Sequence, residues 1–273
     1  MELRFSPLFS GSSGNCTYVG CDEGALLIDA GVSGKRILQA LDDIGAPASS
    51  INGILVTHEH SDHITAVGIL SRKLDIPVYA TEGTWNAMPG KIGDIAAKNR
   101  VIIQPETGFF LGGMEVIPFS TPHDAAESVG FTVSLGRSSF TLATDIGCVK
   151  DGWMQHALES DAVLLESNYD PGMLNASSYP FELKRRIIGR RGHLSNDDCA
   201  EAALRLVNGG IRHLILGHLS KENNYPELAR QVTEMTLTAA GVRLDEDVRV
   251  CVAERDRVTG LYGITADIIQ RRK

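Results

Sequence analysis

The residues best suited to chemistry lie in one short run that follows the apolar residues 54–56. The run consists of Thr57, His58, Glu59, His60, Ser61, Asp62 and His63. Three imidazoles and a carboxylate at the end of a buried strand would leave many lone pairs without partners, unless a metal ion binds them. The spacing His-x-His-x-Asp-His can direct alternate side chains to one ion and the last pair to a second. A surface cluster of polar loop residues is the simpler alternative, but similar residues follow other apolar runs of the chain.

Three more candidate ligands each come just after an apolar run. His123 follows residues 116–119, Asp145 follows 140–143 and His218 follows 214–216. Alone, each has an ordinary structural explanation, such as an aspartate that caps a turn. Together with the first run they supply seven nitrogen and oxygen ligands at the ends of four expected strands. A set of histidines and aspartates without a thiolate suits Zn²⁺, Mn²⁺ or Fe²⁺, and the sequence does not choose among them.

Alternating strand and helix patterns predict one α/β domain over residues 1–273. Strands are expected near residues 3–8, 16–19, 25–28, 78–80, 114–119, 131–135, 140–143, 162–165 and 214–216. Helices are expected at 33–44, 66–74, after 195–196 and from 226. Residues 10–15, which are rich in Gly and Ser, predict a hairpin turn with amides at the rim of the site. Residues 83–98 are only weakly periodic and are interpreted as a possible helical excursion.

Composition narrows the class of protein. Hydrophobic residues make up 43% and charged residues 22%, as in ordinary globular proteins. No apolar run is long enough to span a bilayer, and the N-terminus lacks a signal-peptide core. The five cysteines are odd in number and scattered, so we expect reduced thiols in a cytoplasmic protein. The net charge of −8 argues against nonspecific coating of nucleic acid but permits a local basic track.

The order of these motifs resembles that of the metallo-β-lactamase-fold hydrolases over nearly the whole chain. The resemblance implies a four-layer αββα sandwich with two metal ions at one edge of its sheets. The motif positions imply the following roles: a first metal held by His58, His60 and His123, a second by Asp62, His63 and His218, and Asp145 between both. Asp29 matches a family aspartate that supports the histidine loop from outside the ligand set. It can cap the following turn at the same time.

The remaining motifs point to a subgroup of that family. Residues 121–125 depart from the Gly-His-Thr-Pro-Gly pattern of lactonases and glyoxalase-like thioesterases, and no cysteine stands at the bridging position. No long insertion separates Asp145 from His218, as it does in ribonuclease J-type nucleases. Glu166, His193 and His218 follow the order of the late acid–His–His motifs of nucleases, ribonuclease Z-like enzymes included. Residues 122–125, 166–170, 191–196 and 217–224 resemble the compact bacterial WalJ/YycJ family, which is associated with 5′-to-3′ DNA exonuclease activity.

Phosphodiester cleavage agrees with this set of residues. Two metals can clamp a phosphate and lower the pKa of a bridging water, which yields hydroxide at neutral pH. His193 lies outside the seven ligands and is our candidate to protonate the leaving group, although it can also be a purely structural histidine. We place Asp62 in the catalytic set as well as among the ligands. Glu166 is expected, like Asp29, to support these residues without holding a metal.

Substrate contacts are less specific. Ser195 and Asn196 can cap a helix whose free amides attract phosphate, and Asn223 can orient ligands or touch substrate. Five cations lie just before His193, and either a solvated helix face or a track for a nucleic-acid backbone explains them. They are Lys184, Arg185, Arg186, Arg190 and Arg191, of which Lys184, Arg190 and Arg191 are our candidates for substrate contact. Nearby Tyr169, Tyr179 and Phe181 can stack terminal bases or pack in the core.

Two functions from different classes therefore remain. The preferred one is a dinuclear metal-dependent phosphodiesterase, a 5′-to-3′ exonuclease acting on DNA ends, with no membrane and no obligatory protein partner. The alternative is a small-molecule hydrolase of the same fold, for a cyclic phosphodiester, a thioester or a lactone. A non-enzymatic metal-bearing regulator is disfavoured because the ligand set is complete. A basic groove that leads to the metals would favour the exonuclease. A closed pocket would favour the hydrolase of a small ester.

Overall fold

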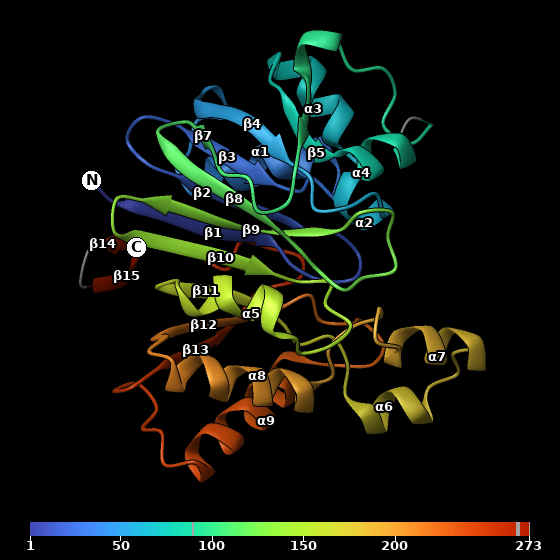
Figure 1. Cartoon of the computed structure of the whole chain (residues 1–273), viewed down its shortest axis with the longest axis vertical. Coiled ribbons are helices and arrows are strands. Elements are labelled where there is room, and N and C mark those ends of the chain that lie inside the picture. The colour runs from blue at the N-terminus through green and yellow to red at the C-terminus, as the bar shows by residue number, and fades with distance from the viewer. Residues whose placement is uncertain (89, 266–267, 273) are drawn as a thin grey trace.

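Two β-sheets lie face to face in the centre of the molecule (Figure 1). The computed structural model describes residues 1–88, 90–265 and 268–272. The first sheet has eight strands, in the order β15 (Ile268–Arg272), β14 (Leu261–Thr265), β1 (Leu3–Phe9), β2 (Cys16–Gly20), β3 (Ala25–Ile28), β4 (Ile51–Leu55), β5 (Val78–Thr81) and β6 (Arg100–Ile103). The second has seven, in the order β13 (Arg249–Val252), β12 (His213–Gly217), β11 (Ala162–Glu166), β10 (Ser138–Ala143), β9 (Val129–Leu135), β8 (Met114–Ser120) and β7 (Phe109–Leu111).

Helices cover the outer face of each sheet (Figure 1). The first sheet carries α1 (Gly34–Asp43), α2 (Ser61–Ile64), α3 (Val67–Leu74) and α4 (Glu82–Ala87), with the short 3-10 turns η1 (Ala48–Ser50) and η2 (Ala97–Asn99). The second sheet carries α5 (Asp151–Leu158), α8 (Asn196–Asn208) and α9 (Pro226–Ala239). The helices α6 (Pro171–Ala176) and α7 (Phe181–Ile188), which lie between β11 and α8 in the sequence, project from the body of the molecule. The layers are therefore αββα, as the sequence predicted.

Three apolar cores hold the layers together. Phe5 of β1 joins the sheets because its ring stacks on Phe140 of β10, with 4.4 Å between the ring centroids. Ile37 of α1 belongs to the core outside the first sheet, and Trp153 of α5 belongs to the core outside the second. Burial of side chains this large is the main stabilising contribution to such a sandwich.

The strand directions bring the polar loops to one edge. The strands β3, β4 and β5 run parallel to one another, as do β10, β11 and β12. Strand β8 points the same way as β10, because both are antiparallel to β9 between them. The candidate ligands follow β4, β8, β10 and β12, and Asp29 follows β3, so these strand directions gather residues distant in the sequence at one end of both sheets.

Some expected elements differ from the structure. Residues 83–98 are helical only within α4, and the part of the following loop that is described lacks regular structure up to η2; Pro89 lies outside the described residues. Ser33 is the N-cap residue of α1, as expected, but its side chain makes no capping hydrogen bond. The hairpin at residues 10–15, the helix start at Pro226 and the nine expected strands are confirmed, and the five cysteines are free. Strands β6, β7, β13, β14 and β15 were missed.

Candidate metal centre and active site

Three strand ends turn sharply into the site. Asp29 after β3, Asp145 after β10 and His218 after β12 have φ values of 62°, 58° and 56°. Residues other than glycine rarely adopt this left-handed conformation, and they do so most often at functional sites. Here the turn swings each side chain from the end of its strand toward the centre of the edge. The buried side chains of all three confirm that none points into solvent.

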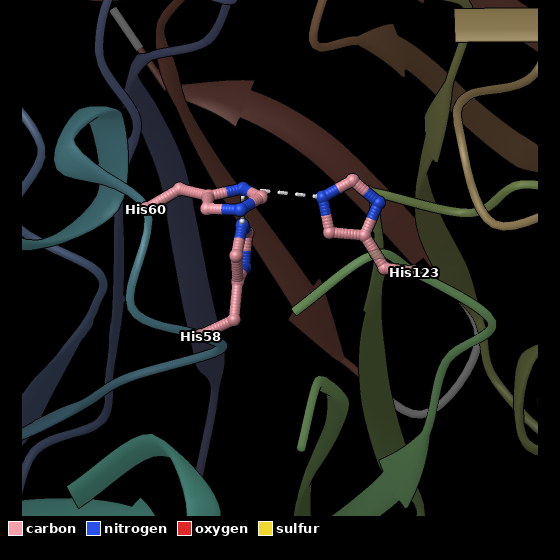
Figure 2. Close-up of side chains that lie close together, drawn as sticks. All are labelled: His58, His60 and His123. Carbon is pink, nitrogen blue, oxygen red and sulfur yellow. Dashed lines mark hydrogen bonds between the residues drawn. The ribbon is translucent and has the colours of Figure 1, made fainter. Parts of the chain in front are cut away.

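Three imidazole nitrogens converge on one point. His58 Nε2 lies 3.0 Å from His60 Nδ1, and His123 Nε2 lies 3.3 Å from the same atom. Figure 2 shows the three rings turned toward one another, with both contacts as dashed lines. Burial lowers the pKa of all three histidines, so their neutral forms are favoured.

Hydrogen bonds behind two of these rings determine which nitrogen faces the centre. The carbonyl of Gly192 accepts from His123 Nδ1 at 3.0 Å, which leaves His123 Nε2 with a lone pair. Thr57 Oγ1 donates to the Asp29 carboxylate and can accept from His58 Nδ1 at 3.0 Å, so His58 Nε2 also presents a lone pair. Two facing lone pairs repel unless a cation lies between them. The donor set therefore fits a metal ion.

A second group of ligand atoms lies beside the first. Asp62 Oδ2 and Asp145 Oδ2 each lie 3.4 Å from His63 Nε2, and His218 Nε2 lies 3.2 Å from Asp145 Oδ1. His63 Nδ1 donates to Asp29 at 2.7 Å, so its Nε2 faces the carboxylates. Each of two triads, His58–His63–Asp145 and Asp62–His63–His218, has its ligand atoms within 4.8 Å of one another.

Charges in this group also fit a cation. Burial alone would lower the pKa of His63, but the carboxylates of Asp62, Asp145 and Asp29 raise it well above its usual value. Burial would raise the pKa of Asp62, yet His63 and His218 lower it to about 2. Asp145 Oδ2 is a buried oxygen without a hydrogen-bond partner among the described residues. A metal ion would satisfy this oxygen and neutralise the clustered carboxylates.

His193 is held at the rim of the cluster by Glu166. Its Nδ1 donates to Glu166 Oε1 at 2.7 Å, while Glu166 Oε2 accepts from the amides of Ile146 and Leu194. Burial lowers the pKa of His193, but the Glu166 carboxylate outweighs it and raises the pKa to about 9. Because Nδ1 is occupied, Nε2 is the atom left for a substrate or a metal. The side chain is 19% exposed, and its ligand atom groups with those of Asp145, Glu166 and His218.

The expected substrate-binding residues fall into two groups. Ser195, Asn196 and Asn223 are all buried. Ser195 caps α8 by accepting from the Asp198 amide at 3.0 Å, and Asn196 bonds to Asn224 and Ser167 inside the protein. These contacts favour positioning roles for Ser195 and Asn196, and direct contact with substrate stays a prediction for all three.

The basic run is mostly occupied by protein contacts. Lys184 Nζ donates to the carbonyls of Asn175 and Ser177, and Arg191 donates to the carbonyls of His123 and Ala125. Arg190 is exposed, and its guanidinium pairs with no described residue. The structure therefore brings Arg191 to the loop of a ligand and leaves Arg190 free on the surface.

Several site residues were missed from the sequence. Asn15 is the principal one, because its Oδ1 accepts from His218 Nδ1 at 3.1 Å while its Nδ2 lies 3.2 Å from His63 Nε2. Thr57 joins Asp29 to His58, and Asp124 Oδ1 lies 3.3 Å from His123 Nε2. The hairpin turn that contains Asn15 was the available signal, since it was expected at the rim of the site.

The fold and the metal-binding cluster together define a metal-dependent hydrolase. The chain belongs to the metallo-beta-lactamase superfamily, whose family model matches residues 10–218. It is 42% identical to the exodeoxyribonuclease YycJ of Bacillus anthracis over 90% of this chain and 93% of that protein. It is 38% identical to the exodeoxyribonuclease WalJ of Streptococcus pneumoniae over 96% of this chain and 98% of that protein. The expected resemblance to the WalJ/YycJ family is confirmed.

Solved structures support the fold. The metallo-beta-lactamase fold protein YhfI of Bacillus subtilis superimposes with a TM-score of 0.68 at 14% identity, covering 94% of this chain and 98% of that one. The short form of human tRNase Z gives a TM-score of 0.59 at 19% identity, covering 98% and 100%. Among the helices of the described residues, none combines the length and the apolar character needed to cross a membrane.

Proposed function

We propose that this protein is a dinuclear metal-dependent exodeoxyribonuclease that degrades DNA from an end in the 5′-to-3′ direction. The observation that carries the DNA substrate is the likeness to two exodeoxyribonucleases over nearly the full length of both chains. The chemistry is supported by a cluster of ligand atoms that includes His193, a partly exposed histidine whose Nδ1 is bonded to Glu166.

The proposed ligands would form two groups, each of which binds one metal ion. His58, His60 and His123 would hold one ion, Asp62, His63 and His218 the other, and Asp145 would contact both. Zn²⁺ or Mn²⁺ suits these ligands, and Fe²⁺ does also. When bound, the ions would neutralise phosphate charge and lower the pKa of a water molecule, so that hydroxide is available near neutral pH. The expectation that this hydroxide lies between the ions, with Asp62 assisting, stays a prediction.

The protein's own groups would handle the leaving alkoxide. Glu166 holds His193 Nδ1–H, so we propose that His193 Nε2–H donates the proton that the departing sugar oxygen needs. The two amides on Glu166 Oε2 keep that carboxylate fixed. The proton on His193 Nε2 therefore has a defined position before the phosphodiester bond breaks.

All the proposed ligands come from one chain, so we propose that catalysis needs no protein partner. A DNA substrate and five free thiols fit a cytoplasmic location, which we also propose.

One assay tests the function. Protein reconstituted with Zn²⁺ or Mn²⁺ is incubated with DNA and RNA labelled at the 5′ or the 3′ end, with bis-p-nitrophenyl phosphate in parallel. We expect mononucleotides to be released first from the 5′ end of DNA. Activity on the small phosphodiester with no degradation of either polymer would contradict the proposal and favour a small-molecule hydrolase.

A further inference from the structure

The guanidinium of Arg186, on helix α7, lies at the rim of the proposed metal centre. Its Nε and Nη2 both donate to the carboxylate of Asp124, and the Nη2 bond to Asp124 Oδ1 is 3.2 Å long. The same Oδ1 lies 3.3 Å from His123 Nε2. One carboxylate oxygen therefore separates the guanidinium from the nitrogen that would bind the first ion.

Arg186 keeps one hydrogen-bonding edge of its guanidinium free. Its Nε and Nη2 face Asp124, whereas Nη1 has no hydrogen-bond or ion-pair partner among the described residues. The side chain is 53% exposed. A guanidinium group is a planar fork of five N–H donors, so it can hold a carboxylate on one edge and a phosphate on the next. The free edge of Arg186 is therefore available to an anion that approaches the metals.

The neighbouring cations of the basic run are placed differently. Lys184 and Arg191 donate to backbone carbonyls, and Arg185 forms an exposed ion pair within α7. Arg190 is exposed, but within the part of the chain that the structure describes its side chain contacts no ligand loop. Arg186 thus combines a free donor edge with a fixed position beside a proposed ligand.

The surrounding charges place Arg186 near both groups of ligands. The hydrogen bond to Asp124 is the main cause that raises the pKa of Arg186 above its usual value, and the carboxylate of Asp62 contributes as well. Asp62 belongs to the second group of proposed ligands, whereas Asp124 adjoins the first. A phosphate bound at the metals would therefore lie within the electrostatic reach of this guanidinium.

We propose that Arg186 binds the phosphate next to the cleaved one, on the part of the DNA strand that remains after cleavage. Because Asp124 lies between Arg186 and His123, the guanidinium is farther out than the groups that would hold the cleaved phosphate. Only a polymer can place phosphates at both positions. Arg186 therefore favours DNA over a small phosphodiester. The inference rests on the proposed function, because it requires the cleaved phosphate to lie at the metals.

Arg186→Gln tests this contact. The change removes the charge from a half-exposed side chain, so the protein should fold normally and keep the metal content of the wild type. We expect kcat/KM on DNA to fall about tenfold to a hundredfold, the loss expected for one charge-assisted hydrogen bond. Hydrolysis of bis-p-nitrophenyl phosphate, which has a single phosphate, should fall far less. The matched control is Arg185→Gln, which changes the net charge equally on the same helix and should degrade DNA like the wild type.

The substrate can be altered instead of the protein. A methylphosphonate linkage carries a methyl group in place of one phosphate oxygen and therefore has no charge. At the second linkage from the 5′ end, it should lower kcat/KM of the wild type by the same factor, while Arg186→Gln should lose little more. The control substrate carries the methylphosphonate at the sixth linkage. Losses that multiply when the variant and the altered second linkage are combined would overturn the contact.

Binding separates this contact from the proposed function. We expect Arg186→Gln, loaded with metal, to bind at least tenfold more weakly to a fluorescein-labelled DNA oligomer whose terminal phosphorothioates slow hydrolysis, as measured by anisotropy. Wild type that degrades DNA no faster than Arg186→Gln would overturn the contact alone. Wild type that binds DNA through Arg186 but degrades none would overturn the proposed function alone. Equal losses on DNA and bis-p-nitrophenyl phosphate, or loss of metal, would show that Arg186 only holds Asp124 beside His123, which also overturns the contact.

Discussion

At the scale of single residues, hydrogen bonds made outside the metal cluster determine its chemistry. Thr57 Oγ1 can accept from His58 Nδ1, Asp29 accepts from His63 Nδ1, and a backbone carbonyl accepts from His123 Nδ1. Each bond uses the ring nitrogen that points away from the centre. In His58 and His123, whose pKa burial lowers, the opposite nitrogen then carries its lone pair inward. His63, whose pKa the carboxylates raise, must give up a proton when a cation binds.

Asp145 provides the direct test of the metal centre. Asp145→Asn keeps a side chain that tolerates the left-handed backbone but removes the charge facing His63 and His218. We expect metal content, measured by elemental analysis, to fall from about two ions per chain to one or none, with loss of hydrolysis. Asp75→Asn is the matched control, since Asp75 also has a positive φ of 53° but forms an exposed ion pair with Lys98 and belongs to none of the candidate metal-binding groups. Full metal content in Asp145→Asn would contradict the assigned role.

His193 is expected to act on the leaving group. His193→Ala should keep its metals and lower kcat on DNA by roughly 10²–10⁴, the usual loss for acid–base assistance. A p-nitrophenolate leaving group needs little protonation, so bis-p-nitrophenyl phosphate should be affected far less. Elemental analysis of the same variant provides the control. Equal losses on both substrates, or loss of a metal, would instead indicate that His193 is a ligand.

The sequence predicted the ligands better than the residues around them. His58 and Asp145 lie two residues after an apolar run and His123 lies four residues after one, so their place near a strand end is a local property. Asn15 contacts His63 and His218, which lie 48 and 203 residues away in the chain. No local pattern encodes such a contact. It arises only when the first hairpin packs beside the ends of β4 and β12.

At the scale of elements, close backbone contacts position the loops. An ideal Cβ on Gly31 would lie 1.6 Å from the carbonyl oxygen of Asp62, and Gly31 N donates to the Asn15 carbonyl at 2.7 Å. The Asn15 amide in turn donates to the Asp62 carbonyl at 2.8 Å. The backbones of the three loops that contain Asn15, Gly31 and Asp62 are thus in direct contact next to the second group of ligands. Only a glycine fits at position 31, because a side chain there would overlap the Asp62 carbonyl.

Gly31→Ala should therefore separate these loops. We expect a lower free energy of unfolding, by about 2 kcal/mol or more, and weaker binding of the second metal. Gly34→Ala is the matched control three residues later, because its nearest neighbour would lie 3.5 Å away, an ordinary contact. Urea unfolding and metal titration measure both effects. A Gly31→Ala protein as stable as Gly34→Ala would refute this account of the crossing.

Strand β12 begins with a histidine that makes stability depend on pH. Burial, assisted by Arg249, lowers the pKa of His213 to about 4. Below about pH 6.5 the His213 imidazole binds a proton in the unfolded chain but stays neutral in the folded protein. This residue therefore lowers the free energy of unfolding as the pH falls from 6.5 toward 4. His213→Gln should lose less stability than wild type between pH 7 and pH 4.5 in urea titrations. Parallel losses in the two proteins would show that His213 does not titrate in this way.

The elements missed from the sequence are short strands near the sheet edges. Strand β6 (Arg100–Ile103) and β7 (Phe109–Leu111) have exposed side chains among their few residues, so neither has a clean alternation. Strand β6 pairs with β5, and β7 pairs with β8. Tertiary contact decides such strands, and local propensity alone does not.

At the scale of the whole molecule, one aromatic stack joins the two halves of the sandwich. The Phe5 ring lies between Phe140 of the second sheet and Tyr262, which returns from the C-terminal end of the chain. Because this stack connects both sheets and both ends of the chain, we propose that residues 1–273 form one cooperative domain.

Tyr262→Ala tests that cooperativity. The loss of a buried ring should lower the free energy of unfolding by about 3 kcal/mol. The chain has two tryptophans, Trp85 on the first sheet's side and Trp153 on the second's. In Trp85→Phe and Trp153→Phe backgrounds the remaining tryptophan reports one half each, and Tyr262→Ala should shift both urea transitions equally. A shift confined to one reporter would divide the chain into two units.

The position of β14 has a consequence for synthesis on the ribosome. Strand β1 is made first, yet its outer neighbour β14 (Leu261–Thr265) is made almost last. Until then the nascent chain exposes the backbone edge of β1, and an open edge invites pairing with other chains. His218 emerges more than forty residues before β14, so every proposed metal ligand is available while the first sheet is still incomplete. Metal captured at that stage would hold the unfinished sandwich together and shorten its exposure to misassembly.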